Sequence, residues 1–395
     1  MEKKAHILFI ASWYPTSNAP ALGNFIQLHA RAAALENNVS VIYAASDENV
    51  EEGEVESINE SSGNLKTFLF SYGKIKSSLP LITQLRKREA YKNAVRTGIN
   101  RAIEENGKPD VLHLHVIWPA AVAVLPMLDE LNIPLIISEH WSGYLPEDGN
   151  YKGIIQKNIS KRIAEKAKHI TAVSQRMIDA LKAHGLGNTF SILPNAVDTT
   201  VFHPLENQSA DNSKLKLVHV SMLVDREKNI SGLLRVMKEL EVRPEVSLEI
   251  IGDGAERNIF ETQAAQSGIL NKSVFFRGFC NAEEIAAAMQ NADALIMFSN
   301  FEGMPVTIIE AQCCGLPVIA TKVGYIPNMV LESQGILVDP VNESGLKNAV
   351  LEFLQKRDLF DREKIAVNAM AKYSLQSVAL ELNNLYASIL DKHEQ

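Results

Sequence analysis

Short apolar segments rich in Val, Ile and Phe alternate along this chain with longer segments in which apolar residues recur every three or four positions. The short segments have the length of strands, and the longer ones have the spacing of amphipathic helices. Strands that alternate with helices in this way form parallel sheets that are covered by helices on both faces. The alternation therefore predicts an α/β fold.

The alternation occurs twice, and each half supplies its own set of strands. In the first half we expect strands at residues 6–11, 39–45, 65–71, 111–116, 135–138, 170–174 and 190–193. In the second half we expect strands at residues 215–221, 248–252, 274–278, 294–299, 317–321 and 335–338. A chain of 395 residues also exceeds what one hydrophobic core usually serves. The sequence therefore predicts two Rossmann-like domains, each with a doubly wound parallel sheet.

Three segments stand outside the strand pattern. Residues 205–213 are rich in Asn, Ser and Asp and have no apolar period, so we expect a linker there. Residues 47–60 are acidic and predict an exposed loop. The last segment, residues 374–390, has helical spacing and could pack on either domain.

Composition narrows the classes of partner and location. Lys and Arg total 39 against 47 Asp and Glu, and the resulting net charge of −8 disfavours nucleic acid as a partner. The first apolar run ends in an aromatic–proline loop instead of a small-residue cleavage site, and no run approaches the roughly 18 apolar residues of a membrane span. The three cysteines have neither metal-ligand nor disulfide spacing. These features favour a cytoplasmic protein.

The most informative stretch is residues 299–311, which read Ser-Asn-Phe-Glu-Gly-Met-Pro-Val-Thr-Ile-Ile-Glu-Ala. It follows an expected strand and opens an expected helix. Pro305 suits the first helical turn, because its missing N–H would have no intrahelical partner there, and Gly303 lets backbone approach a ligand closely. Free amides at a helix start bind anions, since the helix dipole lies behind them. This stretch therefore predicts an anion site.

Two carboxylates lie in the same stretch. Glu302 is in the loop, and Glu310 lies on the helix about 12 Å away at a rise of about 1.5 Å per residue. Carboxylates accept hydrogen bonds from vicinal hydroxyls, so one could meet a sugar while the other accepts from a ribose. The alternative is an exposed loop glutamate and a solvated helix glutamate.

Residues 302–310 resemble the Glu-x7-Glu signature of retaining family-4 glycosyltransferases, which have the GT-B fold. Other matches follow in the family's order: Ala-Val-Ser at 172–174, Pro-Asn-Ala-Val-Asp at 194–198, Ile-Gly-Asp-Gly at 251–254 and Arg-Gly-Phe at 277–279. The resemblance implies transfer of a sugar from a nucleotide-sugar donor to a saccharide or lipid-linked saccharide acceptor, with retention of configuration, in polysaccharide biosynthesis. It also implies an acceptor-binding domain at 1–204 and a donor-binding domain at 214–373 across a cleft, with a C-terminal helix at 374–395 that could pack back on the first domain.

The resemblance also assigns roles at the donor site. Lys228 matches the basic position that neutralises the donor diphosphate, a role that the anionic leaving group requires. Glu302 would hold the donor sugar and Glu310 the ribose. The remaining donor-binding positions are Gly303, Met304 and Pro305 near the phosphates and Arg277 and Gly278, whose backbone would face the base.

This sequence departs from the family's usual pattern just before Lys228. Ser221 and Met222 stand where many relatives have Gly-Arg, so one expected positive charge is missing. Arg226 could supply that charge, or it could be an exposed loop arginine. Lys228 itself could be a surface lysine, but its position in the family pattern favours a functional role.

Two residues of the first domain are candidates as well. Gly23 is the one match to a two-glycine loop of relatives that lies against donor phosphate or acceptor, although an isolated glycine is typical of a turn. His140 follows a strand end, where ligand crevices of open α/β sheets occur, and resembles the family's cleft histidine. Its imidazole could donate to a sugar hydroxyl or orient the acceptor, whereas His113 and His115, inside their strand, are expected to be packed, hydrogen-bonded histidines. We therefore take His140, Glu302 and Lys228 as the candidate catalytic residues.

No metal or other cofactor is expected. The chain contains no Asp-x-Asp, and a basic loop with helix amides can do the work of a divalent ion. Residues 74–101 carry eight Lys or Arg and one acidic residue on an expected amphipathic helix, which leaves peripheral contact with the inner face of a membrane open beside a solvated helix face.

Three alternative functions remain open at this point. They are another enzyme of the same architecture, such as a nucleotide-sugar epimerase or a phosphorylase, a non-catalytic nucleotide-sugar-binding scaffold, and a dinucleotide-dependent oxidoreductase. The last lacks Gly-x-Gly-x-x-Gly after its first strand.

Overall fold

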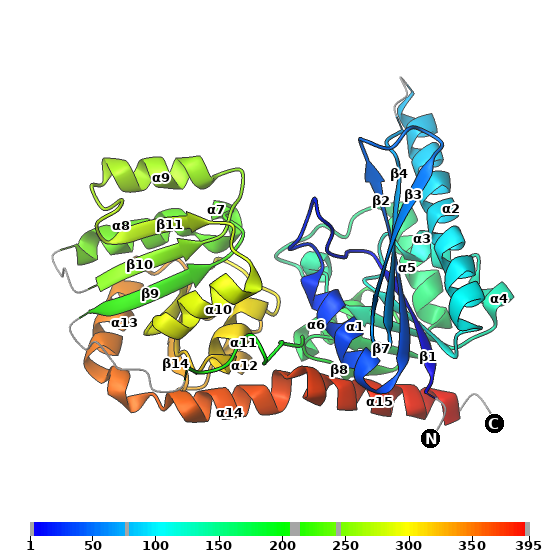
Figure 1. The fold of residues 1–395 in the computed structure, drawn as a ribbon. Helices are drawn as coiled ribbons and strands as arrows, with labels where there is room; N and C mark the ends of the chain where they lie inside the picture. Colours follow the sequence, from blue (N-terminus) through cyan, green and yellow to red (C-terminus); the bar gives the residue numbers. More distant parts are fainter. Residues whose placement is uncertain (1–3, 76–78, 206–213, 242–245, 392–395) are drawn as a thin grey trace. The chain divides into compact units, whose positions relative to one another are not determined.

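The computed structural model describes residues 4–75, 79–205, 214–241 and 246–391. The chain divides into two compact units, Met1–Ala196 with Leu375–Gln395, and Val197–Ser374. Each unit contains one sheet, so the predicted two-domain α/β architecture is confirmed (Figure 1).

The first unit contains an eight-stranded sheet in the order β3-β4-β2-β1-β5-β6-β7-β8. Its strands are β1 (His6–Ala11), β2 (Asn38–Asp47), β3 (Val55–Ser62), β4 (Leu65–Gly73), β5 (Val111–His115), β6 (Leu135–Glu139), β7 (His169–Ala172) and β8 (Phe190–Ile192). Its helices are α1 (Asn24–Glu36), α2 (Pro80–Asn106), α3 (Ala121–Val124), α4 (Leu128–Leu131), the 3-10 turn η1 (Ser142–Tyr144), α5 (Ile154–Lys166), α6 (Gln175–Ala183) and α15 (Leu375–Asp391).

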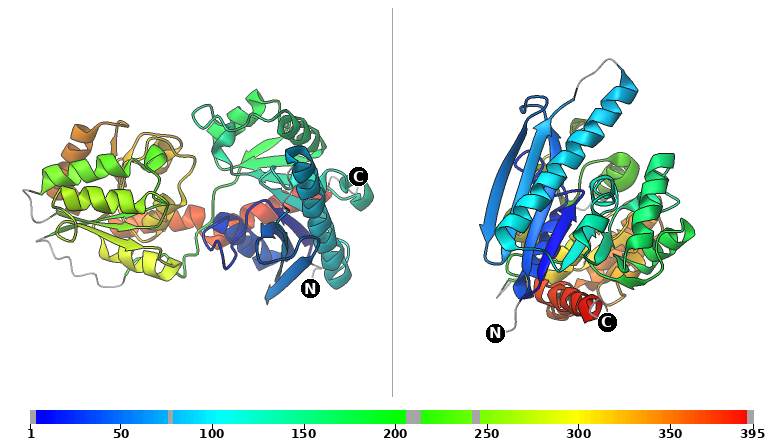
Figure 2. Two further views of the ribbon diagram at one scale, coloured as in Figure 1. Left: turned by 90° about the horizontal axis from the view of Figure 1, so that it is seen from above. Right: turned by 90° about the vertical axis from the view of Figure 1, so that its right-hand side faces the viewer.

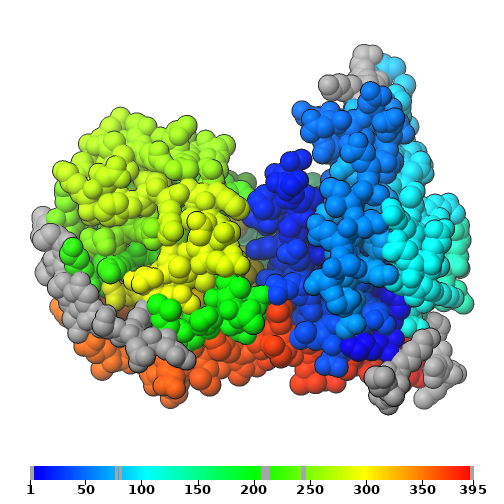
Figure 3. Space-filling view, viewed as in Figure 1, coloured from blue at the N-terminus to red at the C-terminus, as the bar shows by residue number. Residues whose placement is uncertain are grey.

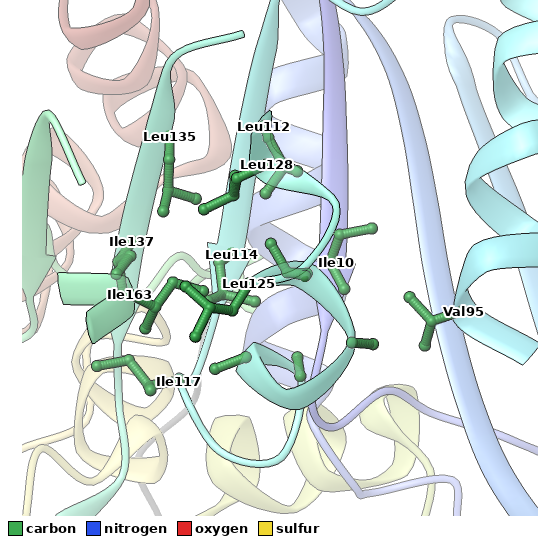
Figure 4. Close-up of a cluster of buried hydrophobic side chains, with 14 of the residues drawn as sticks. Ile10, Val95, Leu112, Leu114, Ile117, Leu125, Leu128, Leu135, Ile137 and Ile163 are labelled. Carbon is green, nitrogen blue, oxygen red and sulfur yellow. The ribbon is translucent and has the colours of Figure 1, made fainter. Parts of the chain in front are cut away.

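Both faces of this sheet are buried, as the near-continuous apolar strands predict. Leu8 and Ile10 of β1 pack into one cluster, and Ile7 and Phe9 pack into another on the opposite face. In the first cluster, strand residues meet side chains of α2 and α5, such as Val95 (Figure 4). The long helix α2 lies along β2 and β4 on that side (Figure 2).

The C-terminal helix α15 completes the second of these faces. It packs against α1 and contributes Tyr386 and Leu382 to the cluster that contains Phe9. In the space-filling view α15 is the red segment on the surface of the first unit (Figure 3). The helix expected over residues 374–390 therefore forms, and it belongs to the N-terminal unit.

The second unit contains a six-stranded, all-parallel sheet in the order β11-β10-β9-β12-β13-β14. Its strands are β9 (Leu215–Val220), β10 (Val246–Ile251), β11 (Val274–Gly278), β12 (Ala294–Met297), β13 (Val318–Thr321) and β14 (Gly335–Val338). Its helices are α7 (Asp225–Lys228), α8 (Ile230–Leu240), α9 (Arg257–Gln266), α10 (Ala282–Asn291), α11 (Val306–Cys313), α12 (Ile326–Met329), α13 (Glu343–Lys356), the 3-10 turn η2 (Arg357–Leu359) and α14 (Arg362–Tyr373).

The expected strands all form, with ends within two residues of those predicted, but one strand was missed. Strand β3 (Val55–Ser62) lies where the acidic composition predicted a loop, and it pairs antiparallel with β4 at the edge of the sheet. All eight of its residues are exposed, so no alternation of apolar and polar side chains marks it. The expectation of an entirely parallel first sheet is therefore wrong at this edge.

The structure and the sequence also differ on where the first unit ends. The sequence assigns residues 197–204 to the first domain, whereas the structure groups them with the second. The N–H of Val197 donates to the carbonyl of Tyr373 (2.7 Å), Phe202 is buried, and Gln290 donates to the carbonyl of His203 (2.7 Å). Residues 206–213 of the expected linker lie outside the described residues.

In the described part of the chain, no helix combines the length and the apolar character needed to cross a membrane.

Candidate functional site

The order in which the chain adds strands to the second sheet reverses between β9 and β12. From β9 the chain continues through β10 to β11 on one side, while β12 begins the succession to β13 and β14 on the other. Ligand crevices in such sheets lie outside the carboxyl ends of the strands at this reversal. The segments that follow β9 and β12 contain Lys228 and Glu302, so both candidates stand at the expected place.

Lys228 and Glu302 form an ion pair. Nζ of Lys228 donates to Oε1 of Glu302 at 2.6 Å, and the side chains are 16% and 8% exposed. The hydroxyl of Ser299 donates to the same Oε1 at 2.7 Å. The structure therefore brings together two of the three predicted catalytic residues.

Backbone contacts fix the two segments that carry this pair. The N–H of Asn300 donates to the carbonyl of Glu227 (2.8 Å), and the Asn300 side chain donates to the carbonyl of Arg226 (3.0 Å). The hydroxyl of Thr321, at the end of β13, donates to the carbonyl of Ser299 (2.7 Å). The guanidinium of Arg226 is exposed and lies 5.8 Å from the ring centre of Phe301. Arg226 thus borders the site.

Met222 stands where the resemblance leads us to expect an arginine. Its side chain is 67% exposed, in the segment between β9 and α7. An arginine would fit there without repacking the core, so the missing charge is a difference in chemistry and not in fold.

Glu310 lies near the middle of α11 and is partly exposed. Among the described residues, none donates a hydrogen bond to its carboxylate. Removal from water raises the pKa of Glu310 to about 7, because burial penalises the charged form. A carboxylate with this environment gains stability from any ligand that donates hydrogen bonds to it.

The loop before α11 packs closely against neighbouring backbone at Glu302 and is unobstructed at Gly303. A Cβ atom built on Gly324, whose φ is +57°, would lie 1.8 Å from the carbonyl oxygen of Glu302. A Cβ atom on Gly303 would meet no atom within 4 Å, so the chain is accessible to a ligand there. Met304 is buried, and Pro305 is the N-cap of α11 with φ −68° and ψ 117°. The placement of Pro305 inside the first helical turn is therefore wrong by one residue, since α11 begins at Val306.

Arg277 and Gly278 lie at the end of β11, two strands from β9. Arg277 is exposed and pairs with Glu249 of β10 at 3.5 Å. In the described ranges, no hydrogen bond or ion pair joins Arg277 or Gly278 to Lys228, Glu302 or Glu310. The structure does not bring these two predicted residues into the cluster.

Gly23 is the N-cap of α1, with φ +68°. A Cβ atom there would lie 2.5 Å from the backbone carbonyl group of Trp13. The close approach of two backbone segments is enough to require glycine at this position, so the turn interpretation explains Gly23.

His140 directly follows β6 and lies among other rings. Its ring centre is 4.7 Å from that of Phe25, 5.2 Å from His29 and 6.0 Å from His115. Burial lowers the pKa of His140 well below 6.5, so the imidazole is neutral. A neutral ring at the end of a strand can accept or donate one proton, as the proposed role toward an acceptor hydroxyl requires.

The two histidines of β5 differ from each other. His113 is packed as expected, with Tyr386 Oη at 2.8 Å from Nδ1 and Ser138 Oγ at 2.7 Å from Nε2. His115 is equally buried, but within the described residues neither of its ring nitrogens has a hydrogen-bond partner. The expectation that His115 is hydrogen-bonded is therefore wrong.

Comparison with known proteins identifies the family. Residues 25–201 match the family described as Glycosyltransferase Family 4, and residues 204–372 match the one described as Glycosyl transferases group 1. The chain belongs to the family-4, group 1 glycosyltransferases. This membership makes the chain an enzyme and sets aside the oxidoreductase, epimerase and phosphorylase alternatives.

Individual relatives agree with this assignment. An uncharacterized glycosyltransferase of Methanocaldococcus jannaschii is 24% identical over 76% of this chain and 80% of its own length. Sucrose-phosphate synthase from Thermosynechococcus elongatus superposes with a TM-score of 0.76 at 20% identity, covering 98% of this chain and 100% of that one. HepE of Anabaena, in complex with UDP-glucose, gives a TM-score of 0.68 at 17% identity over 97% and 99% of the two chains. At these identities, the solved structures establish the shared GT-B fold.

Sequence reasoning missed several residues that lie beside the candidate residues of each unit. Ser299 and Gly324 shape the position of Glu302, and His29 lies beside His140. Ser299 stands within the signature stretch and could have been chosen as a strand-end hydroxyl. No local pattern marks Gly324 or His29, because their partners are distant in sequence.

Proposed function

We propose that this glycosyltransferase moves a sugar from a nucleotide-sugar donor to a saccharide or lipid-linked saccharide acceptor, with retention of configuration. In this proposal no divalent ion bridges the donor diphosphate. The observation that carries the proposal is the largely buried Lys228–Glu302 pair at the point where the second sheet reverses.

The pair has hydrogen-bonding capacity left for a donor. A lysine ammonium has three N–H groups, and Glu302 accepts one of them. The other two N–H groups can donate to diphosphate oxygens. An ammonium group in a largely buried site stabilises the departing anion more strongly than it would in water. Oε1 of Glu302 already accepts from Lys228 and Ser299, so its second oxygen is the one suited to a sugar hydroxyl.

Glu310 is suited to the ribose of the nucleotide. Its carboxylate lacks a donor among the described residues, and vicinal hydroxyls would supply two. Because hydrogen bonds to the charged form favour ionisation, nucleotide binding should lower the raised pKa of Glu310. One helix and its preceding loop would then bind the sugar at one end and the ribose at the other.

Similar proteins support the donor class. HepE was solved with UDP-glucose, and a starch synthase of Arabidopsis with ADP and acarbose. A putative teichuronic acid biosynthesis glycosyltransferase of Bacillus subtilis is 26% identical over 62% of this chain. These names favour a nucleoside-diphosphate sugar and a saccharide acceptor for this chain.

Catalysis in this proposal depends on positioning and on stabilisation of the leaving group. The acceptor hydroxyl attacks the anomeric carbon on the face from which the diphosphate leaves, which retains configuration without an enzymic nucleophile. His140 acts in the first unit, which would bind the acceptor. Its neutral imidazole orients an acceptor hydroxyl or accepts a hydrogen bond from it.

Helix α2 is the segment that peripheral membrane contact would use. Ile82 and Leu85, near its start, are 44% and 59% exposed, and basic residues follow them. Several of those basic side chains are already paired, for example Arg86 with Glu52 and Arg96 with Glu130. The pairing favours a solvated helix face and reduces the charge available to anionic lipid.

A thermal-shift panel of nucleotide sugars tests the donor site. A ligand that binds only the folded state raises Tm, so one donor should stabilise the wild-type chain. The shift should disappear in Lys228→Met and persist in Lys322→Met, a control in which an exposed lysine of the same unit loses its 3.2 Å contact with Asp339. Equal shifts in both variants, or no shift with any nucleotide sugar, would contradict the proposal.

A further inference from the structure

Three histidines from separate elements converge in the first unit. His29 lies on α1, His115 ends β5, and His140 follows β6. One ring nitrogen from each lies within 4.8 Å of the other two. His29 and His115 are fully buried, and His140 is partly exposed as a residue although both of its ring nitrogens are buried.

The hydrogen bond of His29 determines which of its nitrogens is available. Nε2 lies 2.9 Å from the carbonyl oxygen of Pro194, which can only accept, so Nε2 carries the proton. Nδ1 of the neutral ring is therefore a bare lone pair, and in the described part of the chain it has no hydrogen-bond partner. Histidines that bind metals are held in this manner, with the second ring N–H donated to a carbonyl or carboxylate.

The other two histidines also present ring nitrogens that have no hydrogen-bond partner within the described ranges. Both nitrogens of His115 are buried and unpartnered among the described residues, in contrast to those of His113 on the same strand. Both nitrogens of His140 are likewise buried and without a hydrogen-bond partner in the part of the chain that the structure describes.

The spacing agrees with three imidazoles on one ion. For Zn–N bonds of about 2.0–2.1 Å in a tetrahedron, the nitrogens lie about 3.4 Å apart and the ring centres about 5.2 Å apart. The observed ring centres are 5.2 Å apart for His29 and His140, 5.8 Å for His29 and His115, and 6.0 Å for His115 and His140. The three nitrogens lie within 4.8 Å of one another, so binding a common ion requires them to approach by at most about 1.4 Å.

We propose that His29, His115 and His140 form a binding site for a transition-metal ion of the Zn²⁺ class. Neutral imidazole is a ligand that suits Zn²⁺, Cu²⁺ and Ni²⁺, and three protein ligands leave the fourth position of a tetrahedron to water. The site lies in the first unit and is separate from the lysine and glutamates that hold the donor in the proposed function. If His140 acts on the acceptor, a metal ion bound to its ring blocks that action, so Zn²⁺ inhibits transfer. This inhibition rests on the proposed function, whereas the metal site itself does not.

Cobalt spectroscopy tests the site without relying on activity. Untagged protein is stripped with chelator, dialysed and titrated with Co²⁺, and we expect intense visible d–d bands with one equivalent, which added Zn²⁺ abolishes. His140→Ala removes the most exposed ligand and should weaken Zn²⁺ binding in calorimetry by roughly tenfold or more. His203→Ala, which changes an exposed histidine of the second unit, should bind as the wild type does.

Two controls keep the outcomes distinct. Circular dichroism and Tm show whether His140→Ala and His203→Ala fold, and if His140→Ala does not, the cobalt titration of the wild type decides whether the site exists. Absence of the cobalt bands in the wild type, or equal affinity of His140→Ala and His203→Ala, overturns the proposed site. The donor-induced thermal shift in metal-free protein reports on the proposed function separately, because it depends on Lys228.

Discussion

Nζ of Lys228 and Oε1 of Glu302 are 2.6 Å apart, although 74 residues separate them in the sequence. The contact exists because the strands that precede these residues, β9 and β12, are parallel neighbours in the second sheet. The carboxyl ends of parallel neighbours meet at one edge, so residues that follow each strand become adjacent.

Glu302→Gln should lower both stability and activity. Removing one member of a largely buried ion pair leaves the other charge uncompensated, which costs about 3–5 kcal/mol. The double variant Lys228→Met/Glu302→Gln should recover part of that stability without recovering activity. Urea unfolding and steady-state kinetics measure the two effects, and a fully stable, fully active Glu302→Gln would show that the pair is incidental.

Glu310 should make stability depend on pH in a particular direction. Its pKa in the folded chain is about 7 and therefore lies above the ordinary value of 4.5. Between these values the folded state binds more protons than the unfolded state, so this residue's contribution to stability falls as pH rises from about 4.5 past 7. Glu310→Gln should be less pH-sensitive than the wild type when urea unfolding is compared at pH 5 and pH 8. An identical pH profile in both proteins would contradict the raised pKa.

Ionisation of Glu310 should also affect donor affinity, but in the opposite direction: affinity should increase with pH where stability falls. Ribose hydroxyls donate to the ionised carboxylate, so nucleotide-sugar affinity should increase as pH rises through 7. Glu310→Ala should weaken binding by about 10- to 100-fold, as expected when one or two charge-assisted hydrogen bonds are lost. Calorimetry with the donor found in the thermal-shift panel measures both effects; unchanged affinity in Glu310→Ala would remove the ribose assignment.

Gly324→Ala should disturb the position of Glu302. Its positive φ disfavours a side chain, and the added Cβ would also lie 1.8 Å from the Glu302 carbonyl oxygen. Gly268→Ala is a matched control, because Gly268 has φ +74° but no atom within 4 Å of its Cβ position. The control should lose about 1–2 kcal/mol of stability from the left-handed backbone alone, with normal activity. Gly324→Ala should lose more stability and also lower kcat/KM, and equal behaviour of the two variants would contradict this reasoning.

Transfer should proceed in the presence of chelator. In the proposed function Lys228 neutralises the diphosphate, so EDTA should leave activity intact or, if Zn²⁺ occupies the three histidines, increase it. Product formation in EDTA, with and without added Mg²⁺ or Mn²⁺, measures this. Loss of activity that Mn²⁺ or Mg²⁺ restores would overturn the metal-independent mechanism.

Membrane contact through α2 predicts salt-sensitive binding to anionic lipid. Co-sedimentation with liposomes at low ionic strength should then require anionic lipid and decrease in Leu85→Ser, whose exposed side chain lies beside the basic residues. Recovery of the chain in the supernatant with every lipid composition would identify α2 as a solvated helix face.

Local sequence patterns were sufficient to predict the buried strands and the loop and helix that carry Glu302 and Glu310. Alternating apolar segments located the buried strands, and the Glu-x7-Glu spacing located Glu302 and Glu310 on one loop and helix. Strand β3 escaped because an edge strand with every side chain exposed carries no hydrophobic period. Polar edge strands owe their position to backbone pairing with a neighbour.

Long-range contacts explain the remaining differences. His29 and His115 are 86 positions apart, and only the packing of α1 on the sheet brings their rings to 5.8 Å. Glycine is required at 324 because the carbonyl oxygen of Glu302 lies where a Cβ atom would be. No spacing in the sequence predicts that contact. The guanidinium of Arg277 pairs with Glu249 in the next strand, a contact that the motif at 277–279 did not predict, while the expected role of its backbone at the base stays a prediction.

The return of α15 to the first unit has a consequence for how the chain matures during synthesis. Domains generally fold as units as they emerge from the ribosome, the N-terminal one first. Here the N-terminal unit lacks Tyr386, the hydrogen-bond partner of buried His113, until the last helix has been translated. The second unit is contiguous in sequence and can complete its core earlier, so we expect the order of folding to run against the order of translation.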